Sequence, residues 1–177
     1  QVAANRRGAL RLVELISRYS LDEVTRYMRE LLAYSERMTR QLIQGMPDGV
    51  YRFTDYLDDD GFGQEPIPIT VALTIQDDHA LVDFTGTSQQ VAGSLNAVYA
   101  ITLSAVYYVF RSLVGLDIPN NAGCLEPIQV IAPAGTLVNA RHPAPVAGGN
   151  VETSQRIVDV LLGALAQAIP EAVPGWL

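Results

Sequence analysis

The chain has 177 residues, of which 49% are hydrophobic, and it carries a formal net charge of −7. This acidic balance argues against a nucleic-acid-binding protein, because such proteins normally show a basic footprint. All twelve basic residues are arginines, and without lysine the chain can form neither the phosphate-binding loop of a P-loop NTPase nor a Schiff base.

Cysteine content and hydropathy further limit the kinds of protein to which this chain can belong. Cys124 is the single cysteine, so no disulfide forms within the chain, and a buried structural thiol is favoured over a nucleophile. The most apolar stretch, residues 97–110, is shorter than the roughly 20 residues of a membrane span. We therefore expect a cytoplasmic, soluble protein that binds neither nucleic acid nor membrane.

Residues 1–46 predict a helical hairpin. The first helix covers residues 2–19, and the sequence "SLDE" places Ser20 and Glu23 as a capping box at the start of a second helix over residues 21–44. One apolar stripe on the second helix is expected to pack against the first helix or a partner; its members follow a 4-3-4-3-4 spacing and are Val24, Met28, Leu31, Ser35, Met38 and Leu42.

After the hairpin, hydrophobic and polar residues alternate along the chain, which is the pattern of β-strands. Residues 50–57, 67–75 and 79–86 alternate well enough to predict strands. Between the first two lies "DDDGFGQEP", which we interpret as a solvated loop, because it lacks the bidentate glutamate of a calcium-binding EF-hand loop.

Two apolar helices and one more strand region complete the predicted elements. A helix from Asn96 to Val114 is apolar nearly all round and is expected to be buried on most sides. Residues 128–140 predict a strand, a turn and a short strand, and a last helix covers residues 151–169. We therefore expect an α+β fold, in which residues 47–177 form a mixed β-sheet region with two buried apolar helices.

Three polar loops remain, residues 83–96, 120–124 and 141–150, and the first and third each precede an apolar helix. A helix start exposes unpaired N–H groups and partial positive charge, so it can bind an anion. "GGNVETSQR", residues 148–156, is one such start. Asn96 and Asn150 are either ordinary N-caps, for which asparagine is favoured, or groups aimed at a ligand. His79 and His142 lie far apart and neither is near Cys124, so the sequence holds no zinc-site spacing.

Four long motifs carry a family resemblance. "QVAANRRGALRLVELI", "VDFTGTS", "NAGCLEPIQVIAPAGTLVN" and "RHPAPVAGGNVETSQRIVDVLLGALAQAIP" resemble the hydantoinase B family. That family contains the B component of ATP-dependent N-methylhydantoinases, the C-terminal half of oxoprolinases, and the alpha subunit of acetone and acetophenone carboxylases. The resemblance covers the chain end to end.

The resemblance corresponds only to the middle of a family member, so we expect a central fragment. The family's "HH-A-D" region, where the carboxylase branch is expected to hold a divalent metal, would precede Gln1, and its glycine-rich region would follow Leu177. No cofactor is expected in the fragment itself.

The resemblance implies a division of labour. A hydantoinase A-like ATPase subunit or domain would use ATP and Mg²⁺ to activate the substrate, and the B component would act on the activated species. We therefore expect part of the B component of an ATP-dependent cyclic-amide hydrolase, in an oligomer, opening a hydantoin or 5-oxoproline ring; the isolated chain would be inactive. The alternatives are a carboxylase alpha subunit, and a scaffold segment whose chemistry lies elsewhere.

The resemblance also implies candidate site residues. Asn150, with the "GGN" backbone, would steady an oxyanion or phosphorylated oxygen, while Glu152 would orient water or hold Arg156. These three are the candidate catalytic residues, and no metal ligands are assigned. The polar loops and the start of the last helix, rather than the resemblance, supply the candidate substrate- or anion-binding residues, which are Gly148, Gly149, Thr153, Gln155, Thr85, Thr87, Asn96 and Asn121.

Overall fold

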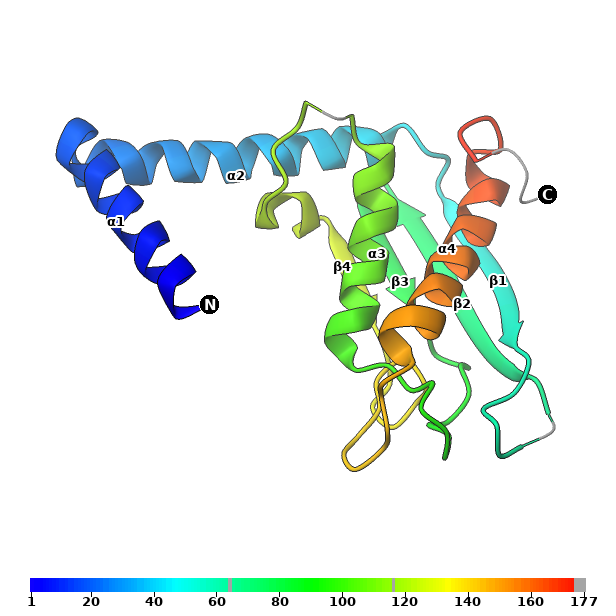
Figure 1. Ribbon diagram of the computed structural model, residues 1–177. Helices are drawn as coiled ribbons and strands as arrows, with labels where there is room; N and C mark the ends of the chain where they lie inside the picture. Colours follow the sequence, from blue (N-terminus) through cyan, green and yellow to red (C-terminus); the bar gives the residue numbers. More distant parts are fainter. Residues whose placement is uncertain (64, 116, 174–177) are drawn as a thin grey trace.

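The computed structural model describes residues 1–63, 65–115 and 117–173. A helical hairpin is followed by a four-stranded mixed sheet with two helices (Figure 1), which confirms the α+β class. The elements in chain order are α1 (Val2–Tyr19), α2 (Leu21–Gln44), β1 (Gly49–Leu57), β2 (Ile67–Gln76), β3 (His79–Asp83), α3 (Tyr99–Leu113), the 3₁₀ turn η1 (Ala122–Leu125), β4 (Ile128–Ile131), the π-helical turn η2 (Gly149–Thr153) and α4 (Ser154–Ala168).

The sheet has the order β1-β2-β3-β4. β1, β2 and β3 are antiparallel neighbours, whereas β4 pairs in parallel with β3, with Ala80 opposite Ile128. Burial alternates along β2, so one face of the sheet is covered and the other is open. The short strand predicted near residues 136–140 does not form: Thr136 makes only isolated bridges, to Gln89 and Asn139.

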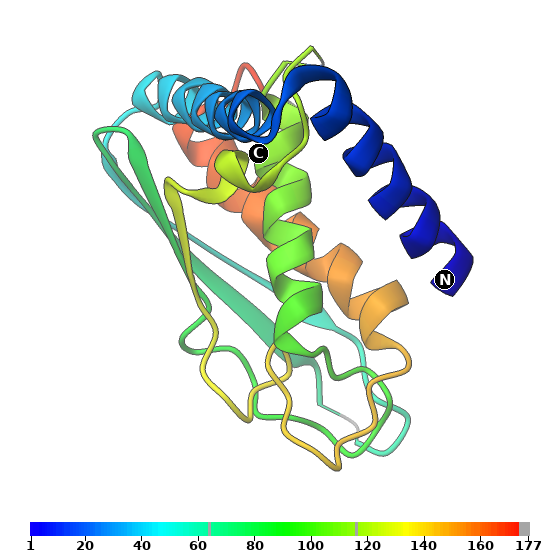
Figure 2. The ribbon, with the colours of Figure 1, turned by 90° about the vertical axis from the view of Figure 1, so that its left-hand side faces the viewer.

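Helices α3 and α4 cover the same face of the sheet (Figure 2). α4 packs on β1 and β2, and Gly163 brings it so close that an added Cβ would lie 2.6 Å from a ring carbon of Phe53. α4 is buried on most sides, as predicted. α3 is also buried on most sides, with Val106 and Phe110 in the core, and it leaves one exposed stripe that includes Tyr108 at 64%.

The hairpin is joined to the rest through the second half of α2. The Ser20 hydroxyl oxygen accepts a hydrogen bond from the Glu23 N–H (3.3 Å), which confirms Ser20 as the cap. The Ser20 N–H donates to the Ile16 carbonyl (2.9 Å) and not to the Glu23 side chain, so the second bond of the predicted capping box does not form. The face that meets the body is centred on Ser35, Thr39 and Ile43, one position away from much of the predicted stripe. The first half of α2 projects beyond the sheet, and α1 turns away from its end (Figure 1).

Loops gather at one end of the molecule. Residues 58–63 follow β1, residues 84–98 connect β3 to α3, and residues 132–148 connect β4 to η2. All three lie at the end where α3 and α4 begin (Figure 1). The polar stretches singled out in residues 83–96 and 141–150 are therefore brought together. No helix within the described part of the chain is both long and apolar enough to cross a membrane.

Candidate functional site

The chain enters α4 through a π-helical turn rather than through an N-cap. Asn150 lies inside η2, its side chain is exposed, and neither η2 nor α4 has a side-chain cap bond. Of the two alternatives for Asn150, the N-cap is wrong, because a cap residue needs non-helical backbone and the chain is already helical there. The Asn150 carbonyl instead accepts a bond from the Ser154 hydroxyl (2.9 Å). Single π-helical turns are rare in proteins, and those that occur are often found at functional sites.

The two glycines before Asn150 allow the surrounding loops to pack closely. The Gly148 N–H donates to the Ser94 carbonyl (2.7 Å) and the Gly149 N–H to the Val146 carbonyl (3.2 Å). A Cβ at Gly149 would lie 2.2 Å from the Asn96 carbonyl oxygen. These N–H groups are engaged within the protein, so the structure gives no support to an anion site built from the glycine backbone.

Asn96 clamps two loops together. It does not begin a helix as predicted, since α3 starts at Tyr99. Its side chain is fully buried, accepts from the Val91 N–H (2.7 Å), and has its amide nitrogen near the carbonyls of Val91 (2.9 Å), Gly93 (3.0 Å) and Pro145 (2.9 Å). All of its polar atoms are engaged, which leaves none for a ligand.

Thr85 and Thr87 follow β3 but do not meet in a common site. The Thr87 hydroxyl is buried, accepts from the Thr70 N–H (3.1 Å) and donates to the Thr70 carbonyl (3.1 Å), so it fastens the loop to β2. Thr85 is exposed, and its N–H donates to an Asp83 carboxylate oxygen (2.8 Å).

Thr153 and Asn121 are also used structurally. The buried Thr153 hydroxyl donates to the Leu95 carbonyl. Asn121 caps η1 through the Gly123 N–H (2.9 Å) and donates to the Ser35 hydroxyl of α2 (2.9 Å). Asn121 therefore fixes the hairpin to the body, far from η2. In the same turn Cys124 is 4% exposed, as expected of a structural thiol.

The remaining candidates lie on two sides of η2. Asn150 and Gln155 line a hollow of about 260 Å³ between α3 and α4, which we name the carboxamide hollow. Besides the two carboxamides, its polar groups are hydroxyls, so it carries no formal charge. Its full lining is Ile101, Ser104, Ala105, Tyr108, Asn150, Ser154, Gln155 and Val158.

Glu152 and Arg156 line a second hollow, which we name the acidic hollow. It has a volume of about 280 Å³ and lies beside the end of β1. Its lining carries three carboxylates and one guanidinium; the lining residues are Leu57, Asp58, Asp59, Leu95, Glu152 and Arg156. The structure thus separates the predicted catalytic residues, with Asn150 on one side of η2 and Glu152 on the other.

Arg156 is held by aspartates rather than by Glu152. Its Nη1 lies 2.5 Å from an Asp55 oxygen on β1 and 3.7 Å from an Asp159 oxygen on α4. Burial raises the pKa of Asp159, and the Arg156 charge opposes this effect. Sequence reasoning missed both partners. Asp159 follows Arg156 by three residues on the same helix, and this spacing could have indicated the ion pair. Asp55 is 101 residues away from Arg156 in the chain, so the sequence gave no indication of that pair.

Asp60 is a third residue that sequence reasoning missed. One of its oxygens accepts from the Gly93 N–H (2.8 Å), and the other accepts from the N–H groups of Phe62 (3.0 Å) and Gly63 (2.9 Å). These bonds, the Gly93 bond first, lower the pKa of Asp60. The "DDDG" loop is therefore anchored to residues 91–95, and the tendency of aspartate to bond nearby backbone N–H groups was the available signal.

The acidic side chains of the described residues form no metal-binding cluster around either hollow. Within residues 1–63, 65–115 and 117–173, no three or more His, Cys, Asp or Glu side chains are placed to hold a metal ion.

Comparison with known proteins identifies the family. The model of the Hydantoinase B/oxoprolinase family matches residues 1–176. The chain belongs to this family. Among curated relatives, it is 39% identical to 5-oxoprolinase 1 of Arabidopsis thaliana, over 93% of the chain and 14% of that protein. It is 40% identical to the 5-oxoprolinase of Saccharomyces cerevisiae, over 92% of the chain and 13% of that protein.

Solved structures show the same fold in two ATP-dependent enzymes. The chain is 31% identical to the ATP-dependent caprolactamase of Pseudomonas jessenii, with a TM-score of 0.88 over 97% of the chain and 30% of that protein. Acetone carboxylase matches with a TM-score of 0.76 and 15% identity over 90% of the chain and 23% of that protein. The chain thus spans about a third or less of these relatives.

Proposed function

We propose that this chain is part of the B component of an ATP-dependent cyclic-amide hydrolase, which acts on a ring activated by a hydantoinase A-like ATPase using ATP and Mg²⁺. The observation that carries the proposal is the 31% identity to a caprolactamase across nearly the whole chain. A 5-oxoprolinase relative at 39% supports the same substrate class. The likeness to acetone carboxylase, at 15% identity, shows the fold alone.

The carboxamide hollow suits a neutral cyclic amide. Such a ring presents one N–H donor and one carbonyl acceptor, and the side chains of Asn150 and Gln155 each offer both kinds of partner. Ile101, Ala105 and Val158 add apolar wall for the ring carbons. Binding sites commonly combine apolar walls with a few convergent polar groups. We assign contact with the ring to this hollow.

The acidic hollow suits water rather than an anion. Asp58, Asp59 and Glu152 would repel a phosphorylated oxygen, because like charges in close proximity disfavour each other. Arg156 is occupied by Asp55 and Asp159, so Glu152 does not hold it. Because η2 separates Glu152 from the carboxamide hollow, Glu152 is not placed to activate water against a ring bound in that hollow. Arg156 then acts as a positioning residue, which ties the first turn of α4 to β1.

The test is reconstitution of the full-length protein with its ATPase partner and Mg-ATP. Ring opening is measured for a hydantoin, 5-oxoproline and caprolactam, alongside bicarbonate-dependent consumption of acetone and acetophenone. ATP-dependent opening of a cyclic amide supports the proposal. Turnover of a ketone with bicarbonate, and of no cyclic amide, refutes it.

A variant pair tests the role of the carboxamide hollow. Asn150→Ala should lower kcat/KM about 10- to 100-fold if its amide contacts the ring oxygen as charge develops there. Val151→Ala, at a neighbouring exposed position, is the matched control and should retain activity. Wild-type rates in Asn150→Ala and in a Gln155→Ala variant would instead favour the scaffold interpretation, with the chemistry outside this chain.

A further inference from the structure

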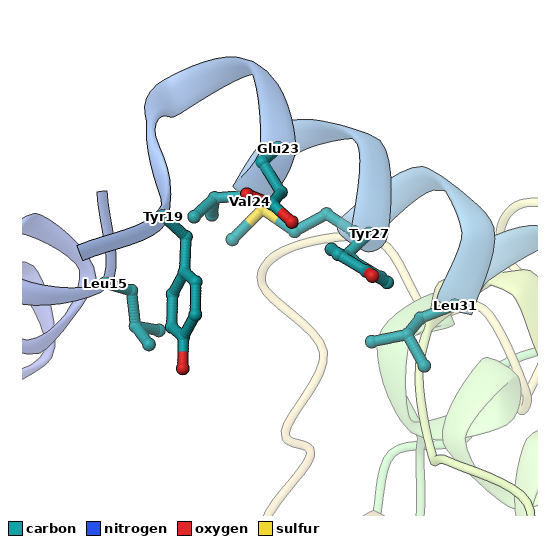
Figure 3. A pocket seen from close by; sticks show the side chains of 7 residues that line it. Leu15, Tyr19, Glu23, Val24, Tyr27 and Leu31 are labelled. Atoms are coloured by element: carbon teal, nitrogen blue, oxygen red, sulfur yellow. The ribbon is translucent and has the colours of Figure 1, made fainter. Parts of the chain in front are cut away.

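The hollows of the molecule differ in how far their polar atoms specify a ligand. The groove between α1 and α2 has one charged side chain, Glu23, among apolar and aromatic ones (Figure 3), so it places little restriction on the chemistry of a ligand. The carboxamide hollow has polar side chains on both of its helices. The hydrogen bonds of two of them determine which polar atoms a ligand meets there.

Two serine hydroxyls line the carboxamide hollow, one from each helix, and each is already used as a donor. The Ser104 hydroxyl of α3 donates to the Ala100 carbonyl (2.8 Å), and the Ser154 hydroxyl of α4 donates to the Asn150 carbonyl (2.9 Å). A hydroxyl has one hydrogen and two lone pairs. Because each hydrogen is directed at a backbone carbonyl, both oxygens can only accept a hydrogen bond from a ligand in the hollow.

These oxygens suit a ring N–H and do not suit a carboxylate beside it. The N–H of a cyclic amide needs an acceptor, and the carboxamides of Asn150 and Gln155 remain for the ring carbonyl. In 5-oxoproline the carboxylate is attached to the carbon next to the ring nitrogen. An oxygen that accepts from the ring N–H therefore also faces the carboxylate, with no hydrogen between them. A carboxylate that leaves water for such a place is destabilised, because buried charges need a cation or donors.

The charges around the hollow act in the same direction. Among the described residues, none of the eight that line it is charged. Across η2, the three carboxylates of the acidic hollow and the two aspartates paired with its Arg156 outweigh that one guanidinium, giving a net charge of −4. The N–H groups of Val151 and Glu152 in η2 donate to the Gly148 carbonyl (3.1 and 2.8 Å), so they are not free to bind an anion either. This field favours a neutral ligand.

We infer that the substrate is a cyclic amide with a free ring N–H and no charged group on the carbon next to it, and that Ser104 and Ser154 are the residues that determine this specificity. The inference rests on the proposed function, which assigns contact with the ring to the carboxamide hollow. A simple lactam or an unsubstituted hydantoin meets the condition, whereas 5-oxoproline does not.

The experiment compares 2-pyrrolidinone with 5-oxoproline, using the full-length protein, its ATPase partner and Mg-ATP. The two compounds are the same five-membered lactam and differ only in the carboxylate, which 5-oxoproline alone carries. Ring opening is measured for both over a range of concentrations. We expect kcat/KM to be at least about 10-fold higher for 2-pyrrolidinone.

A charge-introducing variant tests whether the hollow sets this preference. Gln155 is exposed and lines the hollow, so Gln155→Arg adds a cation there and should lower the ratio of the two kcat/KM values about 10-fold. Gln41→Arg makes the same change in net charge at an exposed position of α2 and should leave the ratio within about twofold. Circular dichroism checks that both variants fold.

Serine variants test the two acceptors directly. Replacing Ser104 and Ser154 together by alanine should lower kcat/KM for 2-pyrrolidinone about 10-fold, as loss of neutral hydrogen bonds does. The value for 5-oxoproline should fall less, because the repulsion of its carboxylate is removed with the acceptors. Replacing both by threonine keeps the hydroxyls and should retain the wild-type ratio.

The outcomes separate this inference from the proposed function. The inference is overturned if 5-oxoproline is opened as efficiently as 2-pyrrolidinone, if Gln155→Arg changes the ratio no more than Gln41→Arg does, or if the serine-to-alanine variant keeps the wild-type ratio. In each of these cases a ring is still opened, so the proposed function stands. If the wild type opens no cyclic amide, the proposed function fails and the inference fails with it.

Discussion

Gly149→Ala should destabilise the protein because two loops meet there without room for a methyl group. The added carbon would lie 2.2 Å from the Asn96 carbonyl oxygen and 2.9 Å from the Ala97 Cα. These are backbone atoms, which cannot rotate away, so the loop must move by about 1 Å to reach an ordinary C···O distance of ~3.3 Å. That shift disturbs the Ala97 N–H bond to the Leu137 carbonyl (2.7 Å). Overpacking of this kind costs about 3 kcal/mol.

The helical backbone of η2 offsets part of that cost, since alanine is favoured over glycine in a helix by about 0.8–1 kcal/mol. We therefore expect a net loss of about 2 kcal/mol, measured as a lower urea midpoint of the full-length protein. Gly8→Ala is the control: a Cβ there meets nothing within 4 Å, so the midpoint should rise slightly. An unchanged midpoint in Gly149→Ala would show that the loops do not meet as described.

Four further substitutions test the acidic end of the molecule. Glu152→Gln should leave the melting temperature and kcat close to their wild-type values, because η2 separates Glu152 from the carboxamide hollow; a fall in kcat of about 100-fold would instead place the reacting ring beside the acidic hollow. Arg156→Met should lower the melting temperature more than Asp55→Asn, because loss of the arginine leaves Asp55 and Asp159 as unpaired neighbouring carboxylates. Each of these half-exposed ion pairs contributes no more than about 1 kcal/mol. A larger effect of Asp55→Asn than of Arg156→Met would contradict the geometry. The pKa of Asp60 is lowered in the folded state, so its contribution to stability is present above the ordinary value of 3.8 and is lost as the pH falls below that value. Asp60→Asn should therefore weaken the fall in stability at acid pH. An unchanged dependence of stability on acid pH would refute this account.

The hairpin and the strands were predictable because their signals are local. The Ser20 cap needs only four consecutive residues, and the alternation of β2 is visible in "IPITVALTI". The stripe on α2 was placed less well, because its partner, η1, lies about 80 residues further along the chain. Close approach of Gly123 to the Leu32 carbonyl helps to select the face that is buried.

The polar residues of the loops were harder to interpret because their partners are distant in sequence. Asn96 bonds to a carbonyl 49 residues away, and Thr153 bonds to one 58 residues away. A glycine or asparagine before a helix is compatible with a cap, a ligand contact or a loop clamp, and only tertiary structure selects among them. The π-turn was equally hidden, since "GGNVET" has the composition of an ordinary helix start.

The parallel pairing of β3 with β4 has a consequence for the order of folding. The antiparallel strands β1, β2 and β3 are joined by short connections, whereas β4 reaches β3 only after the crossover formed by residues 84–127. Closing so long a loop is slow compared with forming adjacent hairpins. The loops around η2 should therefore be completed last and open first, and their amide hydrogens should exchange with solvent through partial unfolding that spares the β1–β2 pair.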